Sequence, residues 1–341
     1  MKRQAISLEA LAERHNLLLA TWKSARGKHH RPAVAHWLAN LERNLSDLAA
    51  RIREGRAPVG GLRRFRILDP KPREISVHGF ADRVLHHAIF NLAEERLERS
   101  LVDSSFACRP GKGVHAAVRL VQQHLQRHAW CVQVDVASYF AQIDHELLMA
   151  LLRKRFKGED FLSLLQRIVE SGAEPGAGRG LPIGALTSQH FANAYLDAAD
   201  RWLLEHPAVR GHVLYMDDIV WWCDGPAQAQ QLLADFESQL WQTRRLRLKP
   251  DAHIGPSSRG LRFCGFRVKP GVVLASSRKL SRFRQGARKL AAYAEEMGTV
   301  GIDEAGGSVM QRAHDGLLAT LAHTQSQHFR QRLWAALQSA V

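Results

Sequence analysis

Two adjacent aspartates lie between apolar, strand-forming runs in the segment Leu214–Trp222. Burying even one unpaired carboxylate costs several kcal/mol, so a buried position for both is unfavourable. A short turn between two paired strands would place Asp217 and Asp218 at its tip, where a divalent cation could offset their repulsion. An exposed hairpin turn that carries two aspartates is the alternative. This aspartate pair constrains the fold more than any other sequence feature, because it predicts a β-hairpin with two negative charges at its tip.

A third aspartate, Asp135, ends another apolar strand pattern that begins at Cys131. The separation of 82 positions from Asp135 to Asp217 leaves room for two helices and a loop before the chain returns to a neighbouring strand. Magnesium prefers hard oxygen ligands from a few carboxylates, completed by phosphate oxygens and water. We therefore predict that Asp135, Asp217 and Asp218 converge on two Mg²⁺ ions. Such a pair of ions, about 4 Å apart, activates a hydroxyl and stabilises a pyrophosphate leaving group.

The charge balance points to a polyanionic partner. The 341 residues include 48 Lys and Arg against 33 Asp and Glu, which gives a formal net charge of +15. Nucleic acid is the simplest such partner, and solubility alone is the alternative. No apolar run is long enough to span a bilayer and no signal sequence is visible, so we expect a cytoplasmic chain without a membrane partner. Four scattered cysteines without a C-x-x-C pair argue against a disulfide scaffold and against structural zinc.

Hydrophobic periodicity divides the chain into three regions. Residues 1–61 are expected to form a helical N-terminal extension, because apolar residues across Val34–Ile52 recur at three- and four-residue steps. Residues 62–275 alternate helical patterns with short β-branched and aromatic runs, which predicts helices mixed with a sheet. Residues 276–341 return to helical patterns, which the glycines of residues 298–307 would interrupt. The predicted fold class is therefore α+β.

The sequence around these three aspartates resembles that of a reverse transcriptase. The tetrad Tyr215–Asp218 is similar to the best-known sequence box of that family, and Asp135 with Phe140 is similar to its upstream metal-binding segment. Five further segments are similar to other blocks of the family, in family order: Arg66–Ile75, Phe80–Val84, Ser105–Gly113, Gly180–Gly184 and Phe263–Phe266. The resemblance implies an RNA-directed DNA polymerase with a right-hand fold. The mixed region would then be fingers and palm, and the helical C-terminal region a thumb.

The same resemblance suggests which residues contact the incoming nucleotide. Arg73 lies in a strongly basic segment and is the candidate that binds the triphosphate. Phe140 resembles the steric gate whose ring fills the space that a ribose 2′-hydroxyl would need, and an ordinary core position is the alternative. The block after Pro182 contributes three more candidates: Ile183, Gly184 and Gln189.

Basic residues in two segments are candidates for nucleic-acid binding. The first set crowds around Asp69: Arg63, Arg64 and Lys71. The second set lies between Ser276 and Leu290, where no acidic residue occurs: Arg278, Lys279, Arg282, Arg284, Arg288 and Lys289. Such residues hold phosphates without selecting a sequence. A solvated basic face is the alternative for both sets.

Two features leave part of the chemistry open. Many reverse transcriptases have a lysine, a candidate proton donor to pyrophosphate, in the block that follows the catalytic loop, but here alanine falls near that position. The donor is therefore left open between Lys249, His253 and water. The pair His86–His87 is similarly open between helix packing and phosphate contact.

The block Ile183–Gln189 also resembles the reverse transcriptases of diversity-generating retroelements, since most other relatives carry glutamine at the position of Ile183. That resemblance implies error-prone copying, mainly at template adenines. It also implies template RNA, cDNA, deoxynucleotide triphosphates and a basic helical-bundle accessory protein oligomer as partners. Isoleucine offers only an apolar contact, so selection would rest on base pairing; core packing of Ile183 is the alternative. A retron or defence-associated enzyme and a non-catalytic RNA-binding scaffold are the competing hypotheses.

Overall fold

The computed structural model describes residues 2–68, 72–173, 176–300 and 314–338, and it begins with a group of helices. These first elements are β1 (Gln4–Ala5), α1 (Leu8–Ala12), α2 (Arg14–Ala25), α3 (Pro32–Ala39) and α4 (Leu41–Arg53). The apolar repeat across Val34–Ile52 therefore forms two helices rather than one. The chain leaves helical geometry at Asn40, where φ is −116° and ψ is 34°. β1 pairs in parallel with β5 (Phe156–Lys157), which ties this group to the body of the protein.

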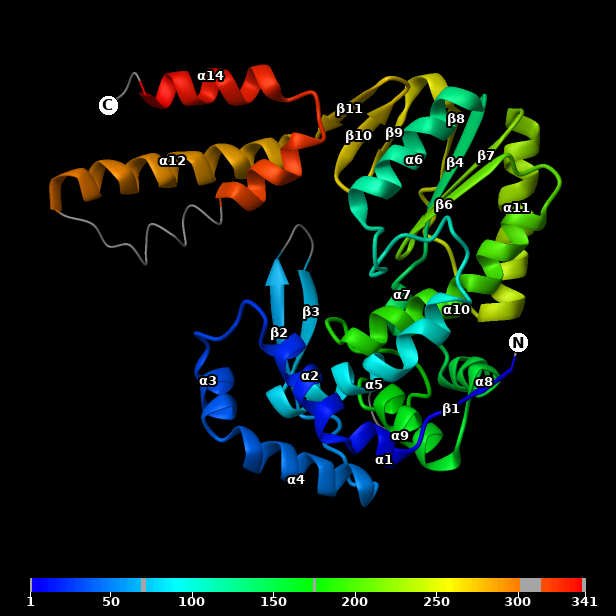
Figure 1. Ribbon diagram of the computed structural model, residues 1–341. Coiled ribbons are helices and arrows are strands. Elements are labelled where there is room, and N and C mark those ends of the chain that lie inside the picture. The colour runs from blue at the N-terminus through cyan, green and yellow to red at the C-terminus, as the bar shows by residue number, and fades with distance from the viewer. Residues whose placement is uncertain (1, 69–71, 174–175, 301–313, 339–341) are drawn as a thin grey trace.

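An antiparallel hairpin follows, made of β2 (Leu62–Leu68) and β3 (Pro72–His78). Helix α5 (Phe80–Glu98) starts directly after it and packs against α2. The remaining helices of this half are α8 (His145–Arg155), α9 (Glu159–Glu170) and α10 (Leu186–Glu205). The Asp144 side chain caps α8 by accepting a hydrogen bond from the Leu147 N–H at 3.1 Å. Figure 1 shows this helical half below the central sheet.

The central sheet has four antiparallel strands in the order β6–β7–β4–β8. Their bounds are β4 (Trp130–Asp135), β6 (Gly211–Tyr215), β7 (Asp218–Cys223) and β8 (His253–Pro256). Successive side chains point to opposite faces, so Trp221 joins the main core with α11 (Pro226–Arg244), whereas Trp222 packs with α6 (Val114–Arg127). Both faces are thus covered, and the strand ends carry the polar residues. The short α7 (Tyr139–Gln142) follows β4.

A second antiparallel sheet leads to the C-terminal helices. It comprises β9 (Leu261–Phe263), β10 (Phe266–Lys269) and β11 (Val272–Ala275), after the 3-10 helix η1 (Ser257–Arg259). Helices α12 (Ser277–Val300) and α14 (Gln327–Gln338) then project away from the sheets side by side (Figure 1). α12 includes Gly298 and is described as far as Val300, which lies within the range 298–307 where the break is predicted. The rest of the predicted break, residues 301–307, lies outside the described residues.

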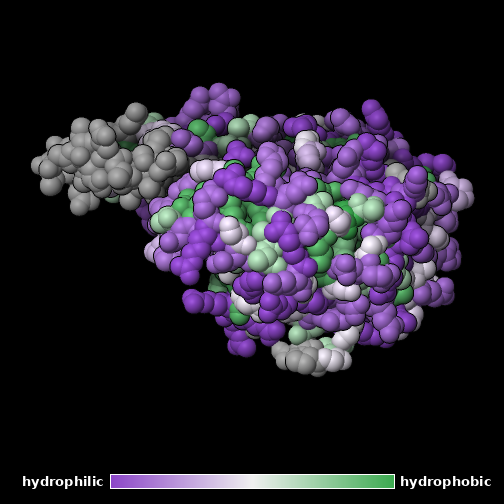
Figure 2. Space-filling view, turned by 60° about the horizontal axis from the view of Figure 1, so that its bottom comes forward, coloured by the Kyte–Doolittle hydropathy of each residue, from purple (hydrophilic) through white to green (hydrophobic). Residues whose placement is uncertain are grey.

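The surface is largely polar on the side that Figure 2 shows, with hydrophobic residues gathered near the centre of that face. None of the described helices is long and apolar enough to cross a membrane.

Candidate active site

The β6–β7 hairpin carries the two adjacent aspartates to the end of the central sheet. Tyr215 pairs with Asp218, so Met216 and Asp217 form a two-residue turn between the strands. Met216 has a φ of +59°, a left-handed conformation that costs energy for a residue other than glycine. The strand pairing on both sides holds this turn in place. Asp217 is therefore fixed at the tip of the hairpin.

Strand β4 places the third aspartate beside this hairpin. Asp135 lies directly opposite Asp218 in the antiparallel β4–β7 pair, and the Cβ atoms of such partners are about 5 Å apart. The Val136 N–H also donates to the Asp217 carbonyl at 3.1 Å. The structure thus brings Asp135, Asp217 and Asp218 together at one end of the sheet.

The acidity of Asp218 is shifted by its surroundings. Burial, together with the negative charges of Asp135 and Asp217, raises the pKa of Asp218 to about 7, although a hydrogen bond from Gln133 and the charge of Lys249 oppose the shift. Gln133 Nε2 donates to Asp218 Oδ1 at 2.8 Å and to the Arg262 carbonyl at 2.8 Å. Sequence reasoning missed Gln133, because a glutamine inside a strand gives no functional signal of its own.

Lys249 forms an ion pair with Asp135. Lys249 Nζ lies 3.1 Å from Asp135 Oδ1, and the Lys249 N–H donates to the Asp135 carbonyl at 2.8 Å. The structure therefore places Lys249 at the site. His253, the other residue left open by the sequence, lies in β8 opposite Gln133 and is exposed.

The three aspartates are the residues that could hold metal ions. Among the residues that the structure describes, no three His, Cys, Asp or Glu side chains already form a metal-binding group. The donor set nevertheless fits Mg²⁺, because all three side chains offer carboxylate oxygens. Burial is the main reason that the pKa of Asp218 is raised, and the negative charges of Asp135 and Asp217 add to it; a divalent cation would neutralise these charges.

Three of the proposed nucleotide contacts lie around the loop that precedes α10. The Ile183 carbonyl accepts a hydrogen bond from the Ser76 N–H at 3.0 Å, and the Ile183 side chain is 37% exposed. Gly184 has a φ of +110°, and a Cβ there would lie 3.0 Å from the Ser76 carbonyl oxygen. Gln189 Oε1 accepts a hydrogen bond from Cys108 Sγ at 3.2 Å. This loop and the β2–β3 hairpin are therefore held together.

The other two proposed nucleotide contacts lie on different elements. Phe140 is in α7, where it is partly buried against the main core, and its ring centroid is 5.6 Å from that of Tyr139. Arg73 is in β3, opposite Ile67.

The basic candidates of β2 point to opposite faces of the hairpin. Arg63 and Arg64 are both exposed, and adjacent residues of a strand alternate between its two sides. One phosphate group could therefore contact only one of them. Lys71, the third candidate of this set, lies outside the described residues.

The six basic candidates of α12 do not share one helix face. Three lie on an outward stripe within about 40° of each other around the helix axis: Arg278, Arg282 and Lys289. Arg288 is exposed but lies off this stripe. Lys279 Nζ is 3.6 Å from the centroid of the Phe266 ring, and Arg284 is 5.5 Å from that of Phe329. Lys279 and Arg284 are thus engaged with aromatic rings.

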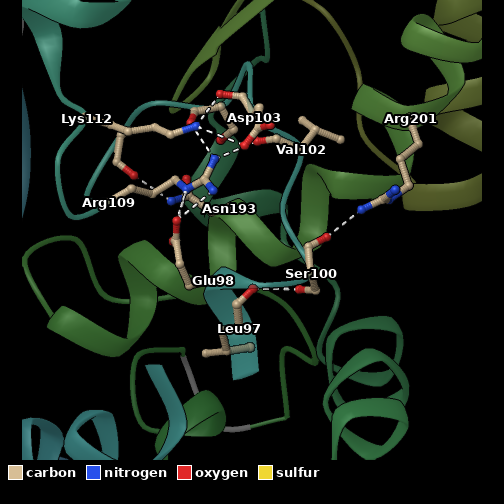
Figure 3. A network of polar contacts seen from close by, with 11 residues as sticks. Leu97, Glu98, Ser100, Val102, Asp103, Arg109, Lys112, Asn193 and Arg201 are labelled. Carbon is tan, nitrogen blue, oxygen red and sulfur yellow. Dashed lines mark hydrogen bonds and ion pairs between the residues drawn. The ribbon is translucent and has the colours of Figure 1, made fainter. Parts of the chain in front are cut away.

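Arg109, which was not a candidate, organises the loop that supports the hairpin (Figure 3). Its buried guanidinium forms an ion pair with Glu98 at 2.6 Å and donates to the carbonyls of Val102 and Ser105 at 2.6 and 2.7 Å. Ser105 in turn forms a β-bridge with Leu214 of β6. A signal was present in the sequence, since Arg109 belongs to one of the family-like blocks, but its structural role was not predicted.

The chain matches the family described as reverse transcriptase (RNA-dependent DNA polymerase) over residues 69–266, more than half of its length. The chain belongs to the reverse transcriptase family. The matched region includes Asp135, Asp217 and Asp218. The α+β right-hand polymerase fold predicted from the sequence is thereby confirmed.

Several known proteins are similar to this reverse transcriptase. Protein YkfC of Escherichia coli strain K12 is 30% identical over 145 residues, which cover 40% of this chain and 38% of YkfC. The group II intron-encoded protein LtrA of Lactococcus lactis subsp. cremoris is 25% identical over 140 residues, 40% of this chain and 23% of LtrA. The matches thus span less than half of the length of either relative. The apo telomerase of Candida tropicalis aligns over 72% of this chain and 54% of its own, with a TM-score of 0.49 and 11% identity.

Proposed function

We propose that this reverse transcriptase synthesises DNA on an RNA template, with Asp135, Asp217 and Asp218 holding two Mg²⁺ ions. The observation that carries the proposal is the pairing of Asp135 with Asp218 across β4 and β7, with Asp217 in the adjoining turn. When bound, the two ions would lower the pKa of the primer 3′-hydroxyl and neutralise charge on the leaving pyrophosphate.

The reaction joins the primer 3′-oxygen to the α-phosphorus of a deoxynucleotide triphosphate. The bond from that phosphorus to the β-phosphate oxygen breaks, pyrophosphate leaves, and the hydroxyl proton passes to solvent. Gln133 holds the Asp218 carboxylate in one orientation through its hydrogen bond. Lys249 offsets the charge of Asp135. The sites proposed for the nucleotide are those of Arg73, Phe140, Ile183, Gly184 and Gln189.

The proposed domain roles follow the three regions of the chain. Residues 62–275 would form fingers and palm, and residues 276–341 a thumb whose stripe of Arg278, Arg282 and Lys289 contacts the template–primer duplex. Residues 1–61 would be an N-terminal extension.

Primer extension tests the reaction itself. The purified protein should extend a DNA primer on an RNA template in the presence of Mg²⁺, stop when the ion is chelated, and resume when Mg²⁺ is restored. Binding of the template–primer without any extension in Mg²⁺ would contradict the proposal.

We also propose that the enzyme copies template adenines with frequent errors, as part of a diversity-generating retroelement with an accessory protein oligomer. The exposure of Ile183 supports this proposal. A core isoleucine would be buried, whereas the side chain of Ile183 is 37% exposed on a loop whose backbone is tied to β3. An apolar side chain in that position can contact a nascent base pair without offering it a hydrogen bond.

Replacement of Ile183 by glutamine tests this proposal. Ile183→Gln should lower misincorporation opposite template adenine more than opposite other bases, with about a tenfold drop in errors for each 1.4 kcal/mol of discrimination gained. Leu204→Gln is the matched control, because Leu204 is also an exposed apolar residue, 45% exposed at the far end of α10. Sequencing of cDNA made by both variants on one template provides the measurement. Equal adenine errors in Ile183→Gln and the native enzyme, with activity retained, would contradict the proposal.

The relatives favour one second candidate. LtrA is described as a group II intron-encoded protein, so this chain could be a reverse transcriptase of that type. For an intron-type enzyme we expect no excess of errors at template adenines. The same sequencing experiment therefore separates the two candidates.

A further inference from the structure

A pocket of about 350 Å³ lies between the N-terminal helices, β3 and the beginning of α10. Its walls include Ser76 and His78 of β3, and Gly184 from the loop before α10. Three basic residues from two segments of the chain also line it: Lys28, Arg31 and Arg83. The active site proposed above uses none of these three.

In the described part of the chain, no acidic side chain forms an ion pair with these three cations. No carboxylate among the described residues lies within 4.0 Å of the charged nitrogens of Lys28, Arg31 or Arg83. Arg83 Nε is buried and has no hydrogen-bond partner in the part of the chain that the structure describes. Burial, followed by the charges of Arg83 and Arg31, lowers the pKa of Lys28, and burial and the charge of Arg31 lower that of Arg83. The cations therefore lie close enough to repel one another.

The backbone adds further positive potential to the same space. The 20-residue helix α10 starts at Leu186, and Ala185 at its N-cap has no side chain that could accept the free N–H groups. Ala185 and Leu186 both line the pocket. The N-terminus of a helix favours an anion through its N–H groups and its dipole. His87 also lines the pocket; its pKa is lowered to about 4 by burial and by the charges of Lys23, Lys28 and Arg83, so it is neutral at pH 7 and can donate a hydrogen bond without adding repulsion.

The position of the pocket indicates which anion could reach it. Gly184 lies on its wall directly after Ile183, so the pocket adjoins the proposed nucleotide site. Figure 1 shows α2 and α3 on the other side of the β2–β3 hairpin from α12. The start of α12 lies close to the aspartates, because Lys279, Asp217 and Asp218 all act on the pKa of the Cys264 thiol. A duplex held against α12 would end near them. The strand that continues toward the pocket is the template that has not yet been copied.

We propose that this pocket binds a backbone phosphate of the single-stranded RNA template ahead of the nucleotide being copied. Lys28 and Arg31 come from the loop between α2 and α3, which gives the N-terminal extension a direct part in template binding. Arg83, from α5, and the N-terminus of α10 complete the pocket. The inference rests on the proposed function, because it takes the template strand as the polyanion.

A double variant of the two loop residues tests the proposal; Lys28 is half-buried and Arg31 is exposed. Lys28→Gln/Arg31→Gln is compared with Arg51→Gln/Lys154→Gln, which removes the same two charges from exposed positions on α4 and α8. Affinity is measured for two primer–template duplexes, one blunt and one with a short 5′-hydroxyl RNA template overhang, over a range of salt concentrations. Thermal unfolding of each variant shows whether the fold is retained.

The pocket variant should bind the overhang substrate about tenfold more weakly than the native protein, because charge-assisted phosphate contacts are lost. The slope of log affinity against log salt should become shallower by up to about 0.7, since the pocket holds one phosphate and each single-strand phosphate contact contributes about 0.7. Binding of the blunt duplex should not change, and the control variant should match the native protein on both substrates.

Three results would overturn the proposal. The first is an equal loss on blunt and overhang substrates, or an equal loss in the control variant, which would indicate only a general effect of charge. The second is a loss seen only when the overhang carries a 5′-phosphate, which would assign the pocket to a terminal phosphate. The third is unchanged template binding with a raised KM for the nucleotide, which would assign it to the triphosphate. Failure of the proposed function is distinguishable, because the native protein would then bind the overhang without extending the primer.

Discussion

Each aspartate of the site has a different environment, although two of them are adjacent in the chain. Asp218 is half-buried and receives the Gln133 hydrogen bond, whereas Asp135 is 45% exposed and paired with Lys249. Asp217 lies in the turn between the strands. One strand pairing therefore places three chemically similar side chains in distinct settings, which suits them to share two metal ions.

Arg109 is the residue whose loss should weaken the support of the hairpin most. Arg109→Met should destabilise the protein by about 2–3 kcal/mol, because it leaves Glu98 and the carbonyls of Val102 and Ser105 without a partner. Arg99→Met is the matched control, since the ion pair of Arg99 with Glu95 is exposed. Urea unfolding gives the comparison. Equal stability of the two variants would contradict the role assigned to Arg109.

His86 should make stability depend on pH. It is buried, with Nδ1 2.8 Å from Thr187 Oγ1, and burial followed by the nearby His78 and His87 lowers the pKa of His86 to about 3. The unfolded chain binds this proton near pH 6.5 and the folded chain only near pH 3, so stability is full above pH 6.5 and falls as the pH is lowered through that window. His86 alone should cost about 2 kcal/mol between pH 7 and pH 5.

Urea unfolding at several pH values measures this dependence. His86→Asn should unfold more easily at pH 7, because burial and packing change, but it should lose less stability than the native protein on going from pH 7 to pH 5. An identical pH dependence in both proteins would contradict the assignment of this proton to His86.

At the scale of elements, local patterns predicted the hairpin but not the contacts that complete the site. The β6–β7 hairpin follows from two apolar strand runs on either side of a polar pair, a signal contained within ten residues. The pairing of Lys249 with Asp135 joins positions more than a hundred residues apart. Periodicity carries no information about such distances, because tertiary packing sets them. Lys249 and His253 therefore could not be separated from the sequence.

For the helices too, the sequence pattern predicted only part of what the structure shows. The apolar repeat across Val34–Ile52 predicted the buried face correctly, but not the break at Asn40, which has no glycine or proline to mark it. The basic residues of α12 were predicted from the sequence, but the helix face on which each one lies was not. Helical geometry separates Lys279 and Arg284, which contact Phe266 and Phe329, from the outward stripe.

The outward stripe of α12, which consists of Arg278, Arg282 and Lys289, should bind the template–primer duplex. Arg282→Gln/Lys289→Gln should weaken binding of a blunt template–primer and flatten its salt dependence by up to about 1.8, at about 0.9 per contact for a B-form duplex and less for a hybrid. The control is Arg51→Gln/Lys154→Gln, which removes equal charge elsewhere. An unchanged slope would make the stripe an ordinary solvated helix face.

Across the whole molecule, the formal net charge is +15. Basic residues gather in two separate places. One is the outward stripe of α12, and the other is the pocket of Lys28, Arg31 and Arg83. The carboxylates of Asp135, Asp217 and Asp218 meet at one end of the central sheet. Such a distribution favours a long polyanion that crosses the aspartates with its phosphates held on either side.

The most direct test of the central claim is single-turnover primer extension on an RNA template by Asp217→Asn. This change keeps the volume of the side chain and removes its charge, so extension should fall by orders of magnitude while template–primer affinity and thermal unfolding stay unchanged. Asp235→Asn, on α11, makes the same chemical change away from the site and should extend the primer like the native enzyme. Extension by Asp217→Asn at the native rate, with equal binding, would contradict the assignment of the three aspartates as the catalytic centre.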